Sequence, residues 1–445
     1  LSGDLFVEIN PITSGIDDVD ITLGANGGSL QHTNDAGSVF VDATSTASGS
    51  EVDVLGGDNT SMKIVGIGNG VSVDGRNDAT EGSYLGGLDI TTADGATNVD
   101  VLTGTDSLTV RSDSGGSVEV FSDDLAAGQT LSLSGDSTFD VENIGASDID
   151  AAATSGTVNV TTLGISGDGT AEAMKITAGT GTLSVSGDDA INGNTDDEDI
   201  EIDADNLADG DGGADLVLAG DAEYFVTNDV VADRSGDEVT IDASGLDASG
   251  SLTLSGLGNF NLINTTQDVT APNLDGILTV TTASGDGPNV IDIEAGTGQL
   301  IVDVVDSGDD ATVDAGNQVD DLTTDDDFAD EANTTADTFE FIAEGSGSVT
   351  VNNVTADVDG KNLEGELTVD ISGGSDVDIR AADGRNTINT NATGGSIDAA
   401  AMGSGDTLFL NDSGDVGVFN LGDQATIDGA SGDYAGVLEV KTDLS

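Results

Sequence analysis

Apolar and polar residues alternate in steps of two along the whole chain. This alternation predicts short β-strands that bury one face. A typical copy begins with a small or polar residue and continues apolar, polar, apolar. The clearest copies are residues 107–110, 117–120, 130–133, 157–160, 182–185, 251–254, 348–351 and 366–369.

The spacing of these segments limits the architectures that they can build. Between Leu108 and Leu183 the first apolar positions of successive segments lie 8 to 16 residues apart, which leaves room only for turns. Antiparallel hairpins favour Asn-Gly or Asp-Gly pairs between longer strands, whereas these connections are loose Ser-Gly-Asp and Ala-Gly-Thr clusters. The sequence therefore predicts an all-β fold, an elongated parallel β-helix (β-solenoid) of short strands with acidic loops, with two or three strands in each coil. Tandem β-sandwich domains are the alternative.

No shift in composition divides the 445 residues. We therefore predict one elongated β-solenoid over residues 1–445. The two least regular stretches, residues 192–213 and 317–337, are predicted to bulge out as acidic loops, and any kink is expected near them.

Charge changes this picture, because the chain has 85 Asp and Glu against 9 Lys and Arg and a formal net charge of −76. Repulsion on this scale opposes compaction unless cations neutralise part of it. With no cysteine and one histidine, the chain is poorly suited to zinc, copper or iron. Calcium takes about six to eight oxygen ligands in flexible geometry, so Ca²⁺ is the predicted ion.

Closely spaced aspartates in the predicted turns are the candidate calcium ligands. Short carboxylate side chains beside glycine turns supply oxygens at the reach that calcium needs. The candidates are Asp17, Asp18 and Asp20; Asp196, Asp197 and Asp199 with Glu198; Asp203, Asp205, Asp209, Asp211 and Asp215; Asp286; Asp309 and Asp310; and Asp325, Asp326 and Asp327.

Residues 210–218, Gly-Asp-Gly-Gly-Ala-Asp-Leu-Val-Leu, resemble the calcium-binding nonapeptide of RTX proteins, with Asp211 in place of the second glycine. Looser copies occur at residues 284–291, which include Asp286, and at residues 383–388. The composition and repeat pattern of the wider chain are similar to those of β-helical surface-layer proteins and giant adhesins exported by bacterial type I secretion. The resemblance implies an extracellular, cell-surface protein that folds in calcium and self-assembles into a layer or filament through calcium-bridged contacts.

The same composition and charge also bear on other partners and functions. The acidic balance disfavours nucleic acid, and no apolar run approaches the roughly 18 residues of a membrane span. A calcium-dependent adhesin that binds a cell-surface polysaccharide is the first alternative. Adaptation to high salt is an alternative origin of the acidity.

A β-helical polysaccharide-active enzyme is disfavoured, because the nine basic residues are scattered and only Arg380 and Arg385 lie close in sequence. The chain is therefore predicted not to be an enzyme.

Overall fold

The computed structural model describes residues 5–9, 18–32, 37–55, 60–74, 88–103, 106–122, 125, 128–144, 147–162, 174–187, 199–207, 216–220, 222–228, 238–246, 251–283, 290–305, 310–314, 341–354, 357–371, 376–390, 394–402, 406–412, 416–421, 425–429 and 438–441. Within them the secondary structure is β-strand without helix, so no described helix is long and apolar enough to cross a membrane. The chain divides into two compact units, Leu1–Val226 (unit 1) and Thr227–Ser445 (unit 2). The all-β prediction is confirmed.

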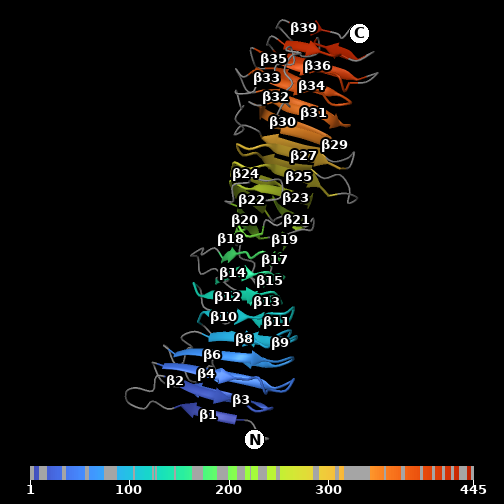
Figure 1. Ribbon diagram of the computed structural model, residues 1–445. Coiled ribbons are helices and arrows are strands. Elements are labelled where there is room, and N and C mark those ends of the chain that lie inside the picture. Colours follow the sequence, from blue (N-terminus) through green and yellow to red (C-terminus); the bar gives the residue numbers. More distant parts are fainter. Residues whose placement is uncertain are drawn as a thin grey trace, which may run out of the picture. The chain divides into compact units, whose positions relative to one another are not determined.

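Unit 1 is built from two parallel sheets that the chain visits in turn (Figure 1). The odd-numbered strands form one sheet: β1 (Leu5–Ile9), β3 (Gly27–His32), β5 (Glu51–Leu55), β7 (Ser72–Asp74), β9 (Val99–Leu102), β11 (Ser117–Phe121), β13 (Thr138–Ile144), β15 (Val158–Thr162), β17 (Leu183–Gly187) and β19 (Leu216–Gly220). The even-numbered strands form the other: β2 (Asp18–Thr22), β4 (Gly37–Asp42), β6 (Thr60–Ile67), β8 (Leu88–Thr92), β10 (Leu108–Arg111), β12 (Thr130–Gly135), β14 (Asp148–Thr154), β16 (Met174–Thr177) and β18 (Asp199–Asp203). The boundary between the units falls inside β20 (Glu223–Asn228).

Unit 2 repeats this arrangement. Its odd sheet holds β21 (Glu238–Leu246), β23 (Asn259–Thr265), β25 (Leu278–Thr282), β27 (Leu300–Val304), β29 (Phe341–Gly345), β31 (Val358–Leu363), β33 (Asp376–Arg380), β35 (Gly394–Asp398), β37 (Val416–Phe419) and β39 (Leu438–Lys441). Its even sheet holds β22 (Ser251–Gly256), β24 (Val269–Leu274), β26 (Val290–Glu294), β28 (Asp310–Asp314), β30 (Ser348–Val354), β32 (Leu367–Ile371), β34 (Asn386–Thr390), β36 (Thr407–Asp412) and β38 (Thr426–Asp428).

Within each unit, strands pair in parallel with the strand two places along the chain, so each coil contains two strands. Leu108 of β10 faces Leu131 of β12 in register, and Val118 of β11 faces Phe139 of β13. This parallel pairing identifies the fold as a β-solenoid and overturns the β-sandwich alternative, in which neighbouring strands would run antiparallel.

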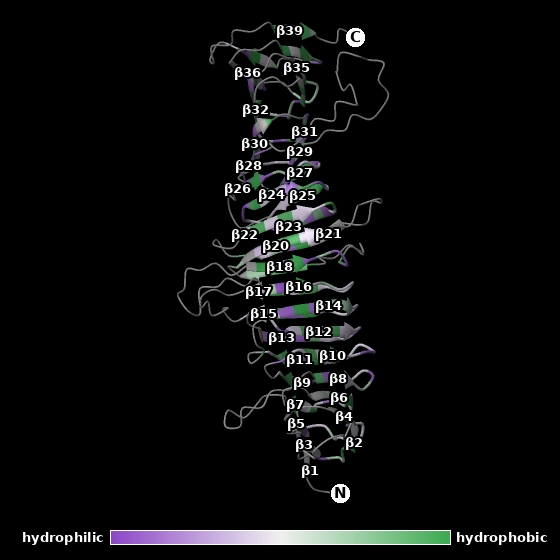
Figure 2. Ribbon diagram, turned by 90° about the vertical axis from the view of Figure 1, so that its left-hand side faces the viewer, coloured by the Kyte–Doolittle hydropathy of each residue, from purple (hydrophilic) through white to green (hydrophobic). Residues whose placement is uncertain are grey.

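The core lies between the two sheets of each unit and is mostly aliphatic. Along β11, for example, Val118 and Val120 are fully buried while Ser117, Glu119 and Phe121 face outward. The same alternation of apolar and polar positions appears along many strands in Figure 2. The hydrophobic pattern of the sequence thus sets which face of each strand is buried.

One strand lies where the sequence predicted a loop. β18 occupies residues within the acidic stretch 192–213, with Ile200 and Ile202 buried on either side of Glu201. The prediction was wrong for this segment, because two apolar residues among so many carboxylates gave too weak an alternation. The rest of that stretch outside residues 199–207, and all of 317–337, lie outside the described residues.

Glycines in the corners allow successive coils to stack backbone on backbone. A Cβ atom on Gly181 would overlap the carbonyl oxygen of Gly156 in the preceding coil, and one on Gly276 would overlap that of Gly258. Neither obstacle is a flexible side chain, so the backbone itself would have to move.

We expect Gly181→Ala to lower the free energy of unfolding of unit 1 by about 1–3 kcal/mol, the usual cost of overpacking. Gly68→Ala is the matched control, because its new Cβ would meet nothing closer than the Thr46 carbonyl oxygen at 3.9 Å. Urea unfolding of both variants checks the difference. Equal losses would show that corner stacking is not the constraint.

Candidate cation-binding site

Among the side chains that the structure describes, seven carboxylates share the outward face of the odd sheet of unit 1. They sit at outward positions of five successive strands of that sheet, β5 to β13. We name this set the acidic face: Glu51, Asp53, Asp74, Asp100, Glu119, Asp140 and Glu142. The cationic side chains in the described part of unit 1 lie on the other sheet, with Lys63 on β6, Arg111 on β10 and Lys175 on β16. The described cationic side chains of unit 1 therefore lie away from the acidic face, on a sheet that also carries carboxylates such as Asp20 and Asp89.

The closest grouping on this face joins three carboxylates from two coils. Glu51, Asp53 and Asp74 can each offer one oxygen such that all three oxygens lie within 4.8 Å of one another. Asp53 and Asp74 face each other in register between β5 and β7. Partial burial, followed by the negative charges of Glu51 and Asp74, raises the pKa of Asp53. A divalent cation would relieve this repulsion, and three carboxylate oxygens would supply part of a calcium shell.

Most of the aspartates predicted as ligands lie outside the described residues: Asp17, Asp196, Asp197, Asp209, Asp211, Asp215, Asp286, Asp309, Asp325, Asp326 and Asp327. Residues 210–215 of the RTX-like stretch 210–218 also lie outside the described residues, and its last three residues begin β19. Asp18 and Asp199 lie in strands β2 and β18. Asp20 and Asp310 are exposed on even-sheet strands of unit 1 and unit 2 respectively.

Asp203 closes a turn. Its Oδ1 accepts a hydrogen bond from the backbone N–H of Asp205 at 3.3 Å, immediately after β18. An equivalent hydrogen bond, in which the aspartate Oδ1 accepts from the backbone N–H two residues further along the chain, recurs where an apolar residue is followed by Asp and then by a buried Ala or Gly. We name these six residues the corner aspartates: Asp42, Asp150, Asp203, Asp242, Asp359 and Asp398.

The corner aspartates explain part of the acidic composition without a metal ion. An Asp side chain that caps its own backbone supplies a hydrogen bond to the amide two residues further on, at a strand end or inside a strand near an irregularity in its pairing. At Asp42, hydrogen bonds from the Thr44 hydroxyl and then the Thr44 amide lower the pKa. Sequence analysis missed this role, although the repeated apolar-Asp-Ala pattern could have revealed it.

The sequence analysis also missed Glu51, Asp53 and Asp74. The predicted ligands are carboxylates that lie close along the chain and in turns, whereas Glu51 and Asp53 lie on β5 and meet Asp74 from β7 of the next coil. The available signal was an acidic residue beside buried valines, as in Glu51-Val52-Asp53 and Ser72-Val73-Asp74, repeated about one coil apart.

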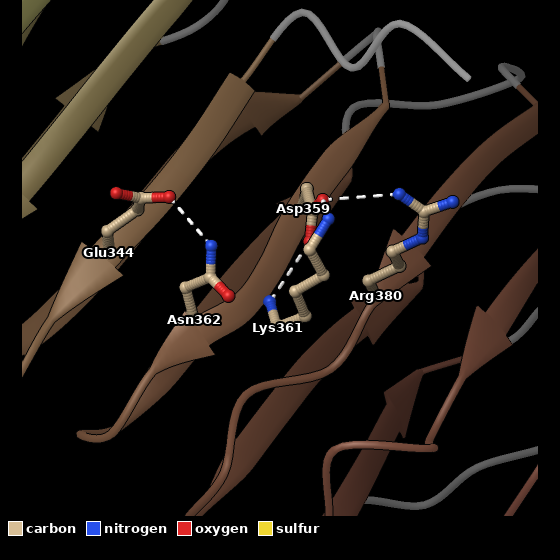
Figure 3. A network of polar contacts seen from close by, with 5 residues as sticks. All are labelled: Glu344, Asp359, Lys361, Asn362 and Arg380. Atoms are coloured by element: carbon tan, nitrogen blue, oxygen red, sulfur yellow. Dashed lines mark hydrogen bonds and ion pairs between the residues drawn. The ribbon is translucent and has the colours of Figure 1, made fainter. Parts of the chain in front are cut away.

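In unit 2, cationic side chains meet a buried carboxylate on the odd sheet (Figure 3). Asp359 is 4% exposed, and its Oδ2 accepts hydrogen bonds from Lys361 Nζ at 2.8 Å and Arg380 Nη1 at 3.2 Å. Arg385 instead lies 3.9 Å from Glu366 and stacks on the Phe409 ring, 4.6 Å from its centroid. Arg380 and Arg385, which are near in sequence, thus have different partners.

These pairings bear on the chemistry that unit 2 could support. A uronate-binding enzyme would need cationic groups aimed at its substrate, whereas Lys361 and Arg380 are both directed at Asp359. The arrangement is that of a structural ion-pair network.

Comparison with known proteins gives no family for the chain: no protein-family model, curated protein or solved structure matches it.

Proposed function

We propose that this chain is an extracellular structural protein that folds and self-assembles with calcium into a surface layer or filament. The observation that carries the proposal is the acidic face of unit 1, in which seven carboxylates occupy five successive strands of one sheet. Parallel strands lie about 4.8 Å apart, so these charges repel one another in the folded state more than in an extended chain.

Bound calcium would turn this repulsion, which destabilises the folded state, into a favourable contribution to the free energy of folding. A cation that binds the native coils but not the unfolded chain adds folding free energy, about 2.7 kcal/mol when its concentration is one hundred times its dissociation constant. A chain of this kind would remain unfolded where calcium is scarce and fold where calcium is abundant, as outside a cell. The resemblance to RTX and surface-layer proteins points in the same direction.

The test is a calcium titration of the full chain from a chelated start. Circular dichroism reports the strand signal and negative-stain microscopy reports assembly, with magnesium and sodium chloride as controls. We expect strand signal and ordered polymers to appear with calcium. A fold already complete in chelator, or one restored equally by any salt, would contradict the calcium mechanism and favour adaptation to high salt. Calcium-dependent folding without polymers would favour a monomeric adhesin.

A pair of triple variants locates the ions. Glu51→Gln with Asp53→Asn and Asp74→Asn removes three charges from the acidic face. The matched control, Asp94→Asn with Asp136→Asn and Glu201→Gln, removes three exposed charges elsewhere in unit 1. We expect only the first variant to weaken calcium binding severalfold, measured by isothermal titration calorimetry. An equal loss in the control would mean that the ions respond to total charge alone.

A further inference from the structure

The chain carries a motif that the proposed function does not use: Asn-X-Ser/Thr, the acceptor motif for N-linked glycans. It begins at Asn59, Asn159, Asn264, Asn333, Asn353, Asn391 and Asn411. The structure describes the asparagine side chain in two of these copies, Asn159 in unit 1 and Asn264 in unit 2. These two side chains can therefore be compared as acceptors.

Asn264 lies at a β-bulge near the end of β23. This strand pairs with β21 as far as Ile263, and its pairing with β25 passes from Leu262 to Thr265, so that two residues of β23 stand against one of β25. A bulge leaves its extra residue outside the strand ladder. Asn264 is exposed, with a φ of 57°, and no hydrogen bond joins its side chain to another described residue. Its amide nitrogen is therefore accessible from solvent.

Asn159 occupies a different kind of position, inside a strand. It lies within β15, in register with Asp140 of β13 and Ser184 of β17. Its side chain is half-buried, and its Nδ2 donates a hydrogen bond to Asp140 Oδ1 at 2.6 Å. Neighbouring strands lie about 4.8 Å away on each side. A sugar on this nitrogen would disturb the hydrogen bond and crowd the adjacent coils.

The backbone accounts for the asparagine at the bulge but not for the threonine that completes the motif. Asparagine tolerates a left-handed backbone better than most residues, so the φ of Asn264 alone would favour it. Thr266 follows the end of β23, and its Oγ1 accepts a hydrogen bond from Nε2 of the adjacent Gln267 at 3.3 Å. That contact is local and joins no two coils. The fold therefore does not require a hydroxyl at this position, whereas the acceptor motif does.

We propose that Asn264 is an acceptor site for an N-linked glycan. The donor is a lipid-linked oligosaccharide diphosphate, used by an oligosaccharyltransferase. Nδ2 of Asn264 forms a bond to C1 of the first sugar, the bond from C1 to the diphosphate breaks, and Nδ2 loses one proton to a base of the enzyme. The lipid diphosphate leaves, and nothing is oxidised or reduced. The inference shares with the proposed function only the requirement that the chain is exported to where such an enzyme acts.

The test presents the folded full chain, made without glycans in a bacterial host, to a purified single-subunit oligosaccharyltransferase and a lipid-linked oligosaccharide. The chain is folded in whichever of calcium or high sodium chloride restores its strand signal, so failure of the calcium proposal does not affect the result. Cleavage before aspartate then releases residues 247–267, whose one acceptor motif begins at Asn264, and residues 150–167, whose one motif begins at Asn159. Mass spectrometry gives the glycan occupancy of each peptide.

Two kinds of control accompany the reaction. The same two peptides, released before the reaction, measure how well each motif is used when it is unfolded. Thr266→Ala removes the motif and Thr266→Ser retains it, while Asn264→Asp removes the acceptor nitrogen and keeps a residue that tolerates the left-handed backbone. Circular dichroism checks that these variants fold like the parent.

We expect the occupancy of Asn264 to exceed that of Asn159 severalfold in the folded chain, with a much smaller difference between the released peptides. Modification at residues 247–267 should disappear in Thr266→Ala and in Asn264→Asp and persist in Thr266→Ser. An unmodified Asn264 in the folded chain would overturn the proposal. So would equal occupancy of Asn159, or the same ratio in the released peptides, because the fold would then not select the site.

Discussion

Replacement of Phe139 by alanine is expected to lower the free energy of unfolding of unit 1 by about 3–5 kcal/mol. Phe139 is fully buried on β13, in register with the core residues Val118 and Val158 of the neighbouring coils. A narrow aliphatic core between two sheets cannot easily collapse around the lost ring, because the backbone spacing of the coils is fixed by their hydrogen bonds.

Phe40→Ala is the matched control for this prediction. Phe40 lies on β4 in the same unit but faces outward and is 38% exposed, so its truncation should change stability by less than about 1 kcal/mol. Urea unfolding at fixed calcium gives both values. Similar losses for the two variants would indicate that the core does not carry the stability of unit 1.

Replacement of Asp359 by alanine is expected to lower the free energy of unfolding of unit 2 by about 3 kcal/mol, because it removes one partner of a largely buried ion pair. The change leaves Arg380, whose side chain is 20% exposed, without this carboxylate, and it also removes the bond to the Lys361 amide. Lys361 is half exposed, so water recovers part of its loss.

Glu366→Ala tests whether burial is the cause. Glu366 and its partner Arg385 are both more than half exposed and 3.9 Å apart, and exposed pairs contribute about 0–1 kcal/mol. Thermal and urea unfolding of the two variants in the same buffer give the comparison. If Glu366→Ala costs as much as Asp359→Ala, the effect belongs to net charge and not to the buried network.

The sequence was sufficient for the strands and the identity of their buried faces. Residues such as Leu108, Val118 and Leu131 reveal their orientation locally, because alternation within four or five residues determines which side meets the core. The choice of a parallel solenoid also followed from local features, namely short strands and loose turns. The prediction failed in the stretch that contains β18, where carboxylates outnumber the apolar residues that define the strand.

The candidate site could not be predicted in the same way. Glu51 and Asp53 meet Asp74 only because β5 and β7 stack in one particular register. That register cannot be read from spacing along the chain, because the length of the intervening connection varies from coil to coil. The buried face of a single strand can be inferred from neighbouring residues, but contacts between side chains of stacked strands can be inferred only once the coils have been aligned.

The pairing of each strand with the strand two places along the chain has a consequence for how the protein can change. Phe341 of β29 is in register with Leu300 of β27 although residues 301–340 lie between them, whereas only residues 279–299 lie between Leu278 of β25 and its partner Leu300. Length added between coils therefore leaves the pairing of the coils intact. Such a scaffold can accept foreign peptides between coils, and its folding can spread from one coil to the next.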